Sequence, residues 1–185
     1  MINLYQEVIL VNERDEVLGT MEKMEAHRKA LLHRAFSIFI FNGKGEMLLQ
    51  QRAKTKYHSA SLWANACCSH PGPGEEVRDA AIRRLKEELG FMTEIEKIFD
   101  FIYKASFDNG LTEYEFDHVF VGTFSGIIFP DKNEVADYCF KSVEEIRNSL
   151  ESHPSKYADW FRIAFPRVIK WLHETRPLSI VSDFS

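Results

Sequence analysis

The stretch on which the expected fold depends reads Ala-Asn-Ala-Cys-Cys-Ser-His-Pro over residues 64–71, and a charged, helix-forming segment follows it at 74–90. Side chains two positions apart on a β-strand point to the same side of the sheet. If the first segment is a strand, Cys68 and His70 face one pocket and Cys67 faces away from it. The unit therefore predicts a strand that presents a thiol and an imidazole together, close to a helix rich in carboxylates.

The helix predicted over 74–90 ends at Gly90, a residue typical of helix C-termini. Apolar residues at helical spacing give it a stripe for burial: Ala80, Ala81, Leu85 and Leu89. Arg84 and Glu88 lie four residues apart and can form an ordinary ion pair along the helix. A solvated charged face explains this pattern as well as a functional site does, so the helix alone does not decide between them.

The rest of the chain predicts a sheet with helices outside it. Strands are expected at 6–11, 17–20, 34–42, 47–52, 94–107, 113–124 and 135–140, and further helices at 21–30, 142–150 and about 155–174. Turn signals at Asn42-Gly43-Lys44-Gly45 and Asp108-Asn109-Gly110 predict two hairpins, the first pairing 34–42 with 47–52. Long antiparallel strands with outer helices indicate an α+β or α/β sandwich.

The composition suits a single globular domain. The 185 residues, 45% of them hydrophobic, are enough for one core, so we expect one domain over 1–185 with an ordered part at about 5–174 and a loosely held tail at 177–185. The net charge of −5 argues against a nucleic-acid binder.

Cysteine usage and the N-terminus bear on location. Three cysteines, two of them adjacent, do not fit a disulfide framework, so a reducing cytoplasm is expected. The first residues have neither the basic start nor the long apolar run of a signal peptide, and no apolar run reaches ~18 residues, so no membrane association is expected.

A scattered set of imidazoles and carboxylates is a candidate metal site. Its members are His27, His33, His70, Glu113 and Glu115. Glu113 and Glu115 lie two apart on an expected strand and share a face. Such a donor set suits Zn²⁺, Mn²⁺ or a similar ion. No short spacing links the five, and an isolated histidine is more often structural. The other histidines are assigned no function: His58, His118, His153 and His173.

Basic and aromatic residues surround the same segments. Lys23, Arg52 and Lys56 precede the thiol and suit a diphosphate, although such residues are often solvated loop charges. Tyr103 and Trp160 are expected to lie in the core unless one of them covers a reaction centre, where an aromatic face stabilises a transient cation.

These residues, taken together and in order, resemble the type 1 isopentenyl-diphosphate Δ-isomerases of the Nudix superfamily. The resemblance covers about residues 5–174. It rests on Leu18-Gly19-Thr20-x2-Lys23-x3-His27, His33-Arg34-Ala35-Phe36-Ser37, Leu49-x2-Arg52-Ala53, Trp63-x-Asn65-x2-Cys68-x-His70-Pro71, Arg83-Arg84-x3-Glu88-Leu89-Gly90 and Glu113-x-Glu115. Each piece alone is weak, but their order and spacing make the combination specific.

The resemblance implies a Nudix fold, a mixed sheet between helices, and the interconversion of isopentenyl and dimethylallyl diphosphate. It implies a catalytic thiol at Cys68 and a catalytic carboxylate at Glu115 on the other side of the substrate, with Tyr103 and Trp160 beside the isoprenoid carbons. It implies one divalent ion (Zn, Mn or Mg) held by His27, His33, His70, Glu113 and Glu115. Glu88 resembles the glutamate that holds a Mg²⁺ bridging to the diphosphate. The diphosphate-binding positions correspond to Lys23, Arg52, Lys56 and Arg84. No flavin is implied, and a monomer or weak dimer is expected.

The implied reaction moves a double bond by one carbon. One proton is added to an unactivated alkene and another is removed from a neighbouring carbon, which calls for an acid and a base on opposite faces of a flat five-carbon unit. Cys68 and Glu115 are the candidate pair, and which of them delivers the first proton stays open. The diphosphate anchors a substrate that otherwise lacks polar groups.

Two positions depart from the Nudix pattern, which expects Gly at Ser69 and Glu at Arg84. Ser69 is strained only if its φ is positive. Arg84 removes a carboxylate that Nudix hydrolases use for metal and water activation, which speaks against the alternative function, hydrolysis of a nucleoside diphosphate derivative. Cys67 beside the catalytic position increases the risk of oxidation there. A non-catalytic, metal-stabilised binding module is the third hypothesis.

Overall fold

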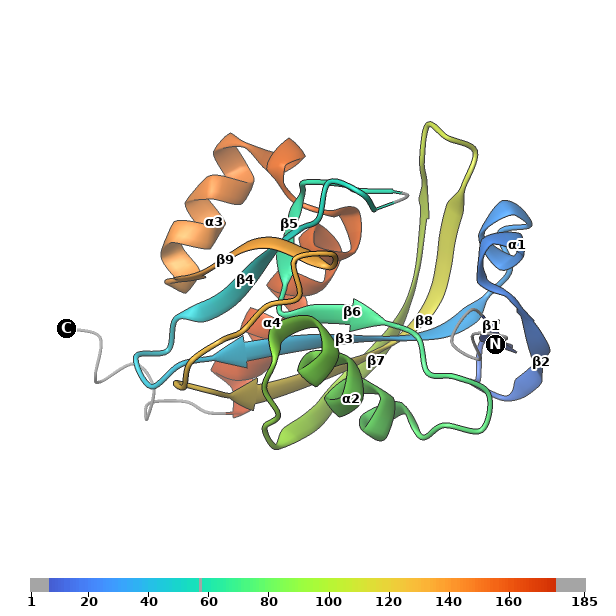
Figure 1. Ribbon diagram of the computed structural model, residues 1–185, viewed down its shortest axis with the longest axis horizontal. Helices are drawn as coiled ribbons and strands as arrows, with labels where there is room; N and C mark the ends of the chain where they lie inside the picture. The colour runs from blue at the N-terminus through green and yellow to red at the C-terminus, as the bar shows by residue number, and fades with distance from the viewer. Residues whose placement is uncertain (1–6, 57, 176–185) are drawn as a thin grey trace.

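A nine-stranded mixed sheet with helices on both faces forms the protein, as the computed structural model shows (Figure 1). The structure describes residues 7–56 and 58–175. The expected tail at 177–185 and residues 5 and 6 of the expected ordered part lie outside these ranges. The predicted α+β architecture is confirmed.

The elements follow the expected order along the chain. The strands are β1 (Glu7–Val11), β2 (Val17–Glu22), β3 (His33–Phe41), β4 (Met47–Arg52), β5 (Trp63–Asn65), β6 (Cys67–Ser69), β7 (Ile95–Ser106), β8 (Thr112–Thr123) and β9 (Val135–Lys141). The helices are α1 (Lys23–Arg28), α2 (Val77–Leu89), α3 (Val143–Ser152), the 3₁₀ turn η2 (Pro154–Lys156) and α4 (Asp159–Thr175). The last helix therefore begins later than the expected residue 155, because η2 comes before it.

Strand β3 brings the site segments together. It pairs in parallel with β8 along its whole length, from His33 opposite Glu115 to Phe41 opposite Thr123. On its other edge it pairs antiparallel with β6, and Ser37 lies opposite Cys68. The strand that carries the thiol and the strand that carries the carboxylates therefore lie on either side of one central strand.

Of the two predicted hairpins, one is confirmed over its full length and the other only at its turn. β7 and β8 pair from Ile95 to Ser106 around the expected turn. β3 and β4, in contrast, meet only where Phe41 lies opposite Met47. A strand has two edges. β3 uses one for β8 and the middle of the other, from Phe36 to Ile38, for β6, so β4 diverges after Met47 and pairs with β5 and β9.

The strand expected over 64–70 is two short strands. β5 pairs with β4 and β6 pairs with β3, and the chain bends between them at Ala66. The Asn65 side chain bridges the bend, since its Nδ2 donates to the carbonyl oxygens of Ile38 and Cys67, each at 3.0 Å. The side-chain amide thus replaces strand hydrogen bonds where the two strands separate.

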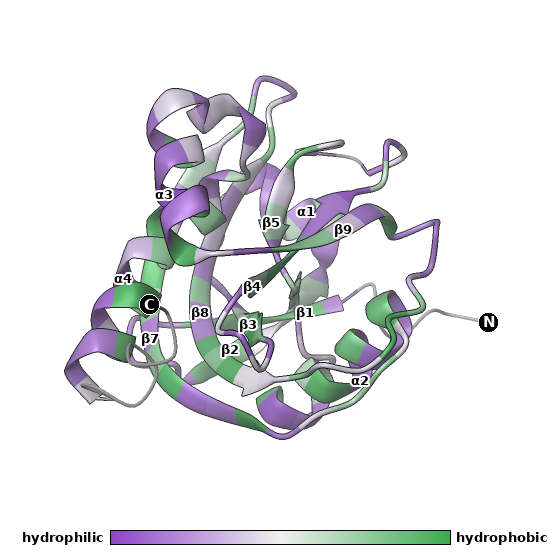
Figure 2. Cartoon of the chain, turned by 90° about the vertical axis from the view of Figure 1, so that its left-hand side faces the viewer, coloured by the Kyte–Doolittle hydropathy of each residue, from purple (hydrophilic) through white to green (hydrophobic). Residues whose placement is uncertain are grey.

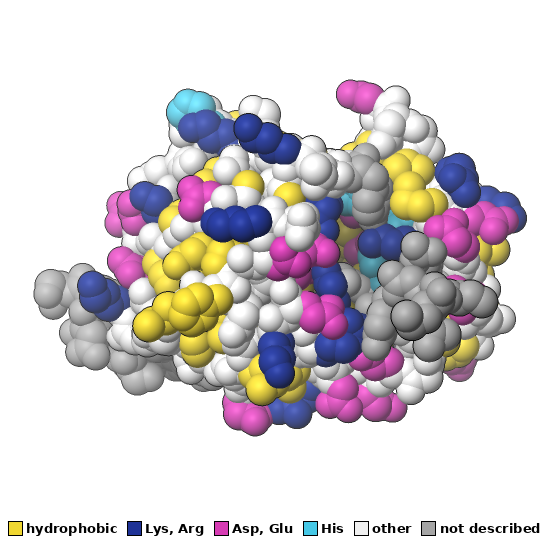
Figure 3. Space-filling view, in the orientation of Figure 1, with side chains coloured by type: hydrophobic (Ala, Val, Ile, Leu, Met, Phe, Trp, Pro, Cys, Tyr) yellow, Lys and Arg dark blue, Asp and Glu magenta, His cyan; other side chains and the backbone are white. Residues whose placement is uncertain are grey.

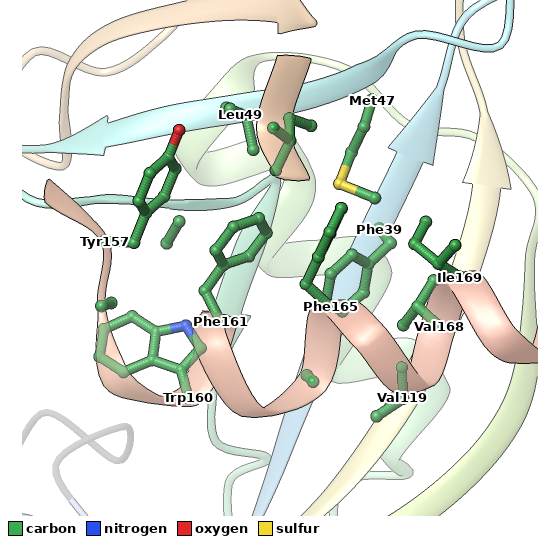
Figure 4. Close-up of a cluster of buried hydrophobic side chains, with 14 of the residues drawn as sticks. Phe39, Met47, Leu49, Val119, Tyr157, Trp160, Phe161, Phe165, Val168 and Ile169 are labelled. Atoms are coloured by element: carbon green, nitrogen blue, oxygen red, sulfur yellow. The ribbon is translucent and has the colours of Figure 1, made fainter. Parts of the chain in front are cut away.

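α2 and α4 cover opposite faces of the sheet. α2 buries its predicted stripe against β3, and Leu85 and Leu89 are fully buried there. It begins at Val77, three residues after the expected start at residue 74. α4 packs on the opposite face, where its Phe161 and Phe165 meet Phe39 of β3 (Figure 4). Both helices carry hydrophobic and hydrophilic residues on different sides, as Figure 2 shows.

None of the helices within residues 7–56 and 58–175 is long and apolar enough to cross a bilayer.

Candidate active site

Four of the five expected metal ligands converge in one cluster. His27 comes from α1, His33 from the start of β3, His70 from the residue after β6 and Glu115 from β8. One donor atom from each lies within 4.8 Å of the others. The fifth, Glu113, forms an adjoining group of the same kind with His27 and with His58, a residue for which the sequence indicated no function. Nitrogen and oxygen donors in this number suit a divalent ion such as Zn²⁺ or Mn²⁺.

Backbone contacts orient two of these rings. His27 Nδ1–H donates to the Lys23 carbonyl oxygen at 2.6 Å, and His33 Nδ1–H donates to the Leu31 carbonyl oxygen at 2.8 Å. In each ring the proton on Nδ1 leaves Nε2 as the nitrogen with a lone pair for a metal ion. The backbone thus selects the tautomer that a metal site requires.

Burial keeps the imidazoles of His27 and His70 neutral. It lowers the pKa of His27 to about 4 and that of His70 to about 3. Burial and the neighbouring Glu115 raise the pKa of Glu113 to about 8. Burial also opposes ionisation of Glu115, but the rings of His33 and His70 outweigh it and hold the pKa of Glu115 well below its usual value. At neutral pH and without a metal ion, the cluster therefore combines neutral rings at His27 and His70 with one ionised carboxylate and one that is mostly protonated.

Tyr103 of β7 links the two glutamates. Its hydroxyl donates to Glu115 Oε2 at 2.6 Å and lies 3.2 Å from Glu113 Oε2. The other oxygen of Glu115, Oε1, faces His70 Nε2 at 3.0 Å and His33 Nε2 at 3.6 Å. Glu115 therefore stands between the histidines and a phenol, which suits a carboxylate whose proton affinity is tuned from both sides.

Cys68 lies among oxygen atoms. Its Sγ–H donates to Asn65 Oδ1 at 3.1 Å, and Sγ lies 3.3 Å from Ser37 Oγ. Ser37 Oγ–H in turn donates to Asp117 Oδ2 at 2.7 Å. Burial, followed by the charge of Asp117, raises the pKa of the Cys68 thiol well above its usual value. The surroundings therefore favour a protonated thiol, which is a proton carrier rather than a reactive thiolate.

The alternation predicted for the cysteines is confirmed. Cys67 is fully buried in the cluster under α2, whereas Cys68 is partly exposed and packs toward the cluster under α4. Ser69 is not strained, because its φ is not positive. Of the two departures from the Nudix pattern, Ser69 therefore costs little.

Basic residues form a charged cluster around Glu88 and Glu134. Arg84 Nη2 donates to Glu88 Oε1 at 2.6 Å and lies 3.5 Å from Glu134 Oε1. Lys56 also forms an ion pair with Glu134. Burial lowers the pKa of Lys23, with a further lowering by the charge of Arg52. Figure 3 shows Lys and Arg side chains gathered along a hollow, with His and acidic side chains between them. The charges of Arg52, Lys23 and Lys56 act on His58, and those of Arg52 and Arg84 act on Lys23, so the four expected diphosphate-binding residues share one electrostatic region.

Trp160 borders the same region from α4. The guanidinium of Arg52 lies over its ring, 5.1 Å from the centroid, and the ring of His58 meets it edge-on at 6.0 Å. The indole is buried, with 3% of its surface exposed. Trp160 therefore belongs both to the core of α4 and to the border of the site.

Sequence reasoning missed two residues of the site. Asp117 continues the spacing of Glu113 and Glu115 along one face of β8, so that alternation would have identified it. His58 lies in the loop after β4, and no spacing rule relates it to Glu113, although their side chains are 3.0 Å apart.

Comparison with known proteins places the chain in a class. The Nudix domain family matches residues 31–161. A solved structure from Deinococcus radiodurans superposes with a TM-score of 0.73 at 19% identity, covering 87% of this chain and 98% of that one. A MutT protein from Methanosarcina mazei superposes with a TM-score of 0.63 at 20% identity, covering 78% and 96%. At this identity the structures show the fold alone, and that fold is a Nudix fold.

Relatives with higher sequence identity show which Nudix proteins the chain resembles in sequence and length. The isopentenyl-diphosphate Delta-isomerase of Pectobacterium atrosepticum is 45% identical over 162 residues, 88% of this chain and 90% of the relative. That of Burkholderia multivorans is 44% identical over 173 residues, 91% of this chain and 98% of the relative. The chain belongs to the isopentenyl-diphosphate Delta-isomerases of the Nudix family.

Proposed function

We propose that the protein interconverts isopentenyl diphosphate and dimethylallyl diphosphate, for isoprenoid biosynthesis, by adding a proton on one face of the substrate and removing one from the other. The observation that carries this proposal is the placement of a thiol and a carboxylate at two ends of one strip of β3. Cys68 lies opposite Ser37 and Glu115 lies opposite His33. Four residues of strand span about 13 Å, which leaves room for a five-carbon unit between the side chains.

The floor of that strip supports the same proposal. Residues 33, 35 and 37 of β3 point to one face, and the middle one is Ala35, the smallest side chain of the three. A flat apolar substrate would stand with its edge on this methyl group, so that one face is turned to Cys68 and the other to Glu115. The two residues are the proposed catalytic acid–base pair, and Tyr103 assists through its hydrogen bond to Glu115.

We assign the metal roles from the donor sets. His27, His33, His70, Glu113 and Glu115 are proposed to hold one divalent ion, Zn²⁺, Mn²⁺ or Mg²⁺. When bound, such an ion lowers the basicity of Glu115 and fixes its rotamer, which adjusts the carboxylate for proton transfer. The chain's own residues already prepare this state, because the rings of His27 and His70 are neutral and the Nδ1–H groups of His27 and His33 are bonded to the backbone.

A second ion, Mg²⁺, is proposed at Glu88, where it would bridge to the diphosphate. Glu88 is buried, and its carboxylate accepts hydrogen bonds from Arg84 at 2.6 Å and from Gln50 at 3.1 Å. Arg84 can turn from Glu88 to a phosphate oxygen without leaving the site, since a guanidinium binds phosphate in the same forked geometry as carboxylate.

The diphosphate is proposed to bind among Lys23, Arg52, Lys56 and Arg84. Glu134 contacts two of these cations, and a diphosphate would take its place as their partner. Binding energy from this end of the substrate positions the hydrocarbon end, which offers no polar group of its own. The rings of Tyr103 and Trp160 are proposed to border the carbons and shield a carbocation-like state from water.

We also propose a cellular compartment and an oligomeric state for the protein. Cys67, Cys68 and Cys139 are all free thiols, which supports a reducing compartment such as the cytoplasm. We propose a monomer or weak dimer over 1–185 that acts on a small molecule.

The test compares two substrate classes on one purified protein. Isopentenyl diphosphate and a panel of nucleoside diphosphate derivatives are each incubated with the protein and a divalent ion. We expect dimethylallyl diphosphate from the first and no phosphate release from the second, because Arg84 stands where hydrolases carry a metal-binding carboxylate. Turnover of the panel alone would establish the hydrolase instead, and metal binding with no turnover of either would favour a binding module.

A further inference from the structure

His58 lies in the metal region, although the sequence indicated no function for it. It belongs to the loop after β4, and 7% of its surface is exposed. Its Nε2 is 3.0 Å from Glu113 Oε1, and its Nδ1 is 3.2 Å from the hydroxyl of Ser59. The serine O–H can donate to Nδ1, which places the ring proton on Nε2, facing the carboxylate.

Aromatic neighbours fix the plane of this ring. Phe107 stacks on it with 4.7 Å between centroids and 11° between planes, and Trp160 meets it at 86°. A ring clamped on its face and at its edge presents Nε2 in one direction. The contact with Glu113 is therefore part of the packing and not a chance encounter of two mobile side chains.

His27 belongs to two groups of potential metal ligands. One group also contains His33, His70 and Glu115, and the other contains His58 and Glu113. Because Nδ1 of His27 is bonded to the Lys23 carbonyl oxygen, both groups would use the same nitrogen, Nε2, and one nitrogen binds one ion. The two groups therefore surround a single ion position from two sides. Glu113 lies on the side of His58.

We propose that His58 is a positioning residue of this metal centre, whose Nε2–H donates to Glu113 and holds the carboxylate in the orientation that binds the ion. Glu113 then accepts from His58 on Oε1, while its Oε2 lies 3.2 Å from the Tyr103 hydroxyl, whose proton is donated to Glu115. A carboxylate has about four lone-pair sites, so the one donor at Oε1 leaves capacity for a metal ion. Partners of this kind orient the ligands that touch a metal. The inference rests on the proposed function only for the existence of the metal site.

The experiment measures Zn²⁺ affinity by competition with a chromophoric chelator, without any activity assay. We expect His58→Ala to weaken Zn²⁺ binding by about 10- to 100-fold, and His58→Gln, which keeps an N–H donor, to recover most of the loss. His118→Ala is the matched control, because His118 is also buried and also pairs with a carboxylate, Asp15, at 3.0 Å, but on the other face of β8. Circular dichroism checks that each variant folds.

Three results would overturn the proposal. One is unchanged Zn²⁺ affinity in a folded His58→Ala variant. Another is an equal loss in His118→Ala, which would point to a general effect of losing a buried histidine. The third is a His58→Gln variant as weak as His58→Ala, which would indicate that the ring binds the ion itself. If the wild-type protein binds no divalent ion, the proposed metal site fails and not this inference alone.

Discussion

Cys68 owes its chemical character to three oxygen-bearing side chains from three strands. Asn65 Oδ1 accepts a hydrogen bond from the Cys68 thiol. The Asn65 Nδ2 group donates to two backbone carbonyl oxygens, and this fixes the amide with its oxygen toward the sulfur. Ser37 approaches from the opposite strand and is itself bonded to Asp117. The neighbour Cys67, one residue away, faces an apolar cluster instead. Two neighbouring residues of β6 thus differ in role, because Cys68 is a proton carrier and Cys67 is a core residue.

This contrast gives a paired prediction. Cys68→Ala should lower the isomerisation rate by roughly 10²- to 10⁴-fold, the contribution of one positioned acid or base, while the fold and the bound metal are retained. The rate of dimethylallyl diphosphate formation measures the loss. Cys67→Ala is the matched control and should change the rate little, at a stability cost of about 1 kcal/mol for a buried atom removed.

The pair of variants can also contradict the account. Near-full activity in Cys68→Ala would remove the thiol from the mechanism. A loss in Cys67→Ala as severe as that in Cys68→Ala would refute the assignment of the two side chains to opposite faces.

At the residue scale, sequence alone predicted the ligand types but only some of their neighbours. Glu113 and Glu115 were identifiable because strand alternation puts both on one face. His58 was not, since its approach to Glu113 depends on the path of a loop, which follows from tertiary packing against Phe107 and Trp160. The same spacing rule that identified the glutamates extends to Asp117.

At the scale of elements, helix α2 shows how a backbone position supports the site. Gly90 caps the C-terminal end of this helix. The residue has φ +77°, and the N–H of Gly90 donates to the Lys86 carbonyl oxygen. A Cβ at this residue would lie 2.5 Å from the Phe129 carbonyl oxygen. Because Glu88 lies two residues earlier, the end of the helix also positions the proposed Mg²⁺ ligand.

Substitution of this glycine should therefore be costly. We expect Gly90→Ala to lower the free energy of unfolding by about 2 to 4 kcal/mol, the sum of left-handed backbone strain and a steric clash. Gly110→Ala is the control, since Gly110 has φ +79° but no neighbouring atom within 4 Å of the place a Cβ would take, so it should cost only about 1 kcal/mol. Urea denaturation measures both, and equal losses would show that the contact with Phe129 is unimportant.

The elements also mark where sequence patterns stop being informative. The helical stripe of α2 and the β7–β8 hairpin were predictable because their spacing and turn signals are local. The separation of β3 from β4 beyond the turn was not, because a tight turn predicts a full hairpin and β6 occupies the edge of β3 that β4 would need. The break at Ala66 has the same cause, since β5 and β6 follow different partners.

For the whole molecule, buried titratable groups predict how stability varies with pH in the absence of metal. The folded state lowers the pKa values of His27, His58 and His70 to between about 3 and about 4, from the 6.5 of the unfolded chain. Below about pH 6 the unfolded state therefore binds more protons, and stability falls as the pH falls. Glu113 and Asp117 have raised pKa values and act in the opposite direction, but the three histidines outnumber them.

Above pH 6.5 the sign reverses. The histidines become neutral in both states, while Glu113, with its pKa of about 8, stays protonated only in the folded protein. Stability then decreases as the pH rises toward 8. Urea denaturation in EDTA should therefore give a maximum between about pH 6 and pH 6.5, and a stability that increases steadily to pH 8 would contradict the assigned protonation states.

The central claim is that Cys68 and Glu115 exchange protons with the two faces of the substrate, and an isomerisation carried out in D₂O tests it most directly. Wild-type protein with isopentenyl diphosphate should form dimethylallyl diphosphate that carries deuterium from the solvent in a methyl group, as mass spectrometry and NMR would detect. In the same time, Cys68→Ala should form less labelled product by roughly 10²-fold or more. Product that forms without deuterium, or forms equally well in the Cys68→Ala variant, would contradict the account.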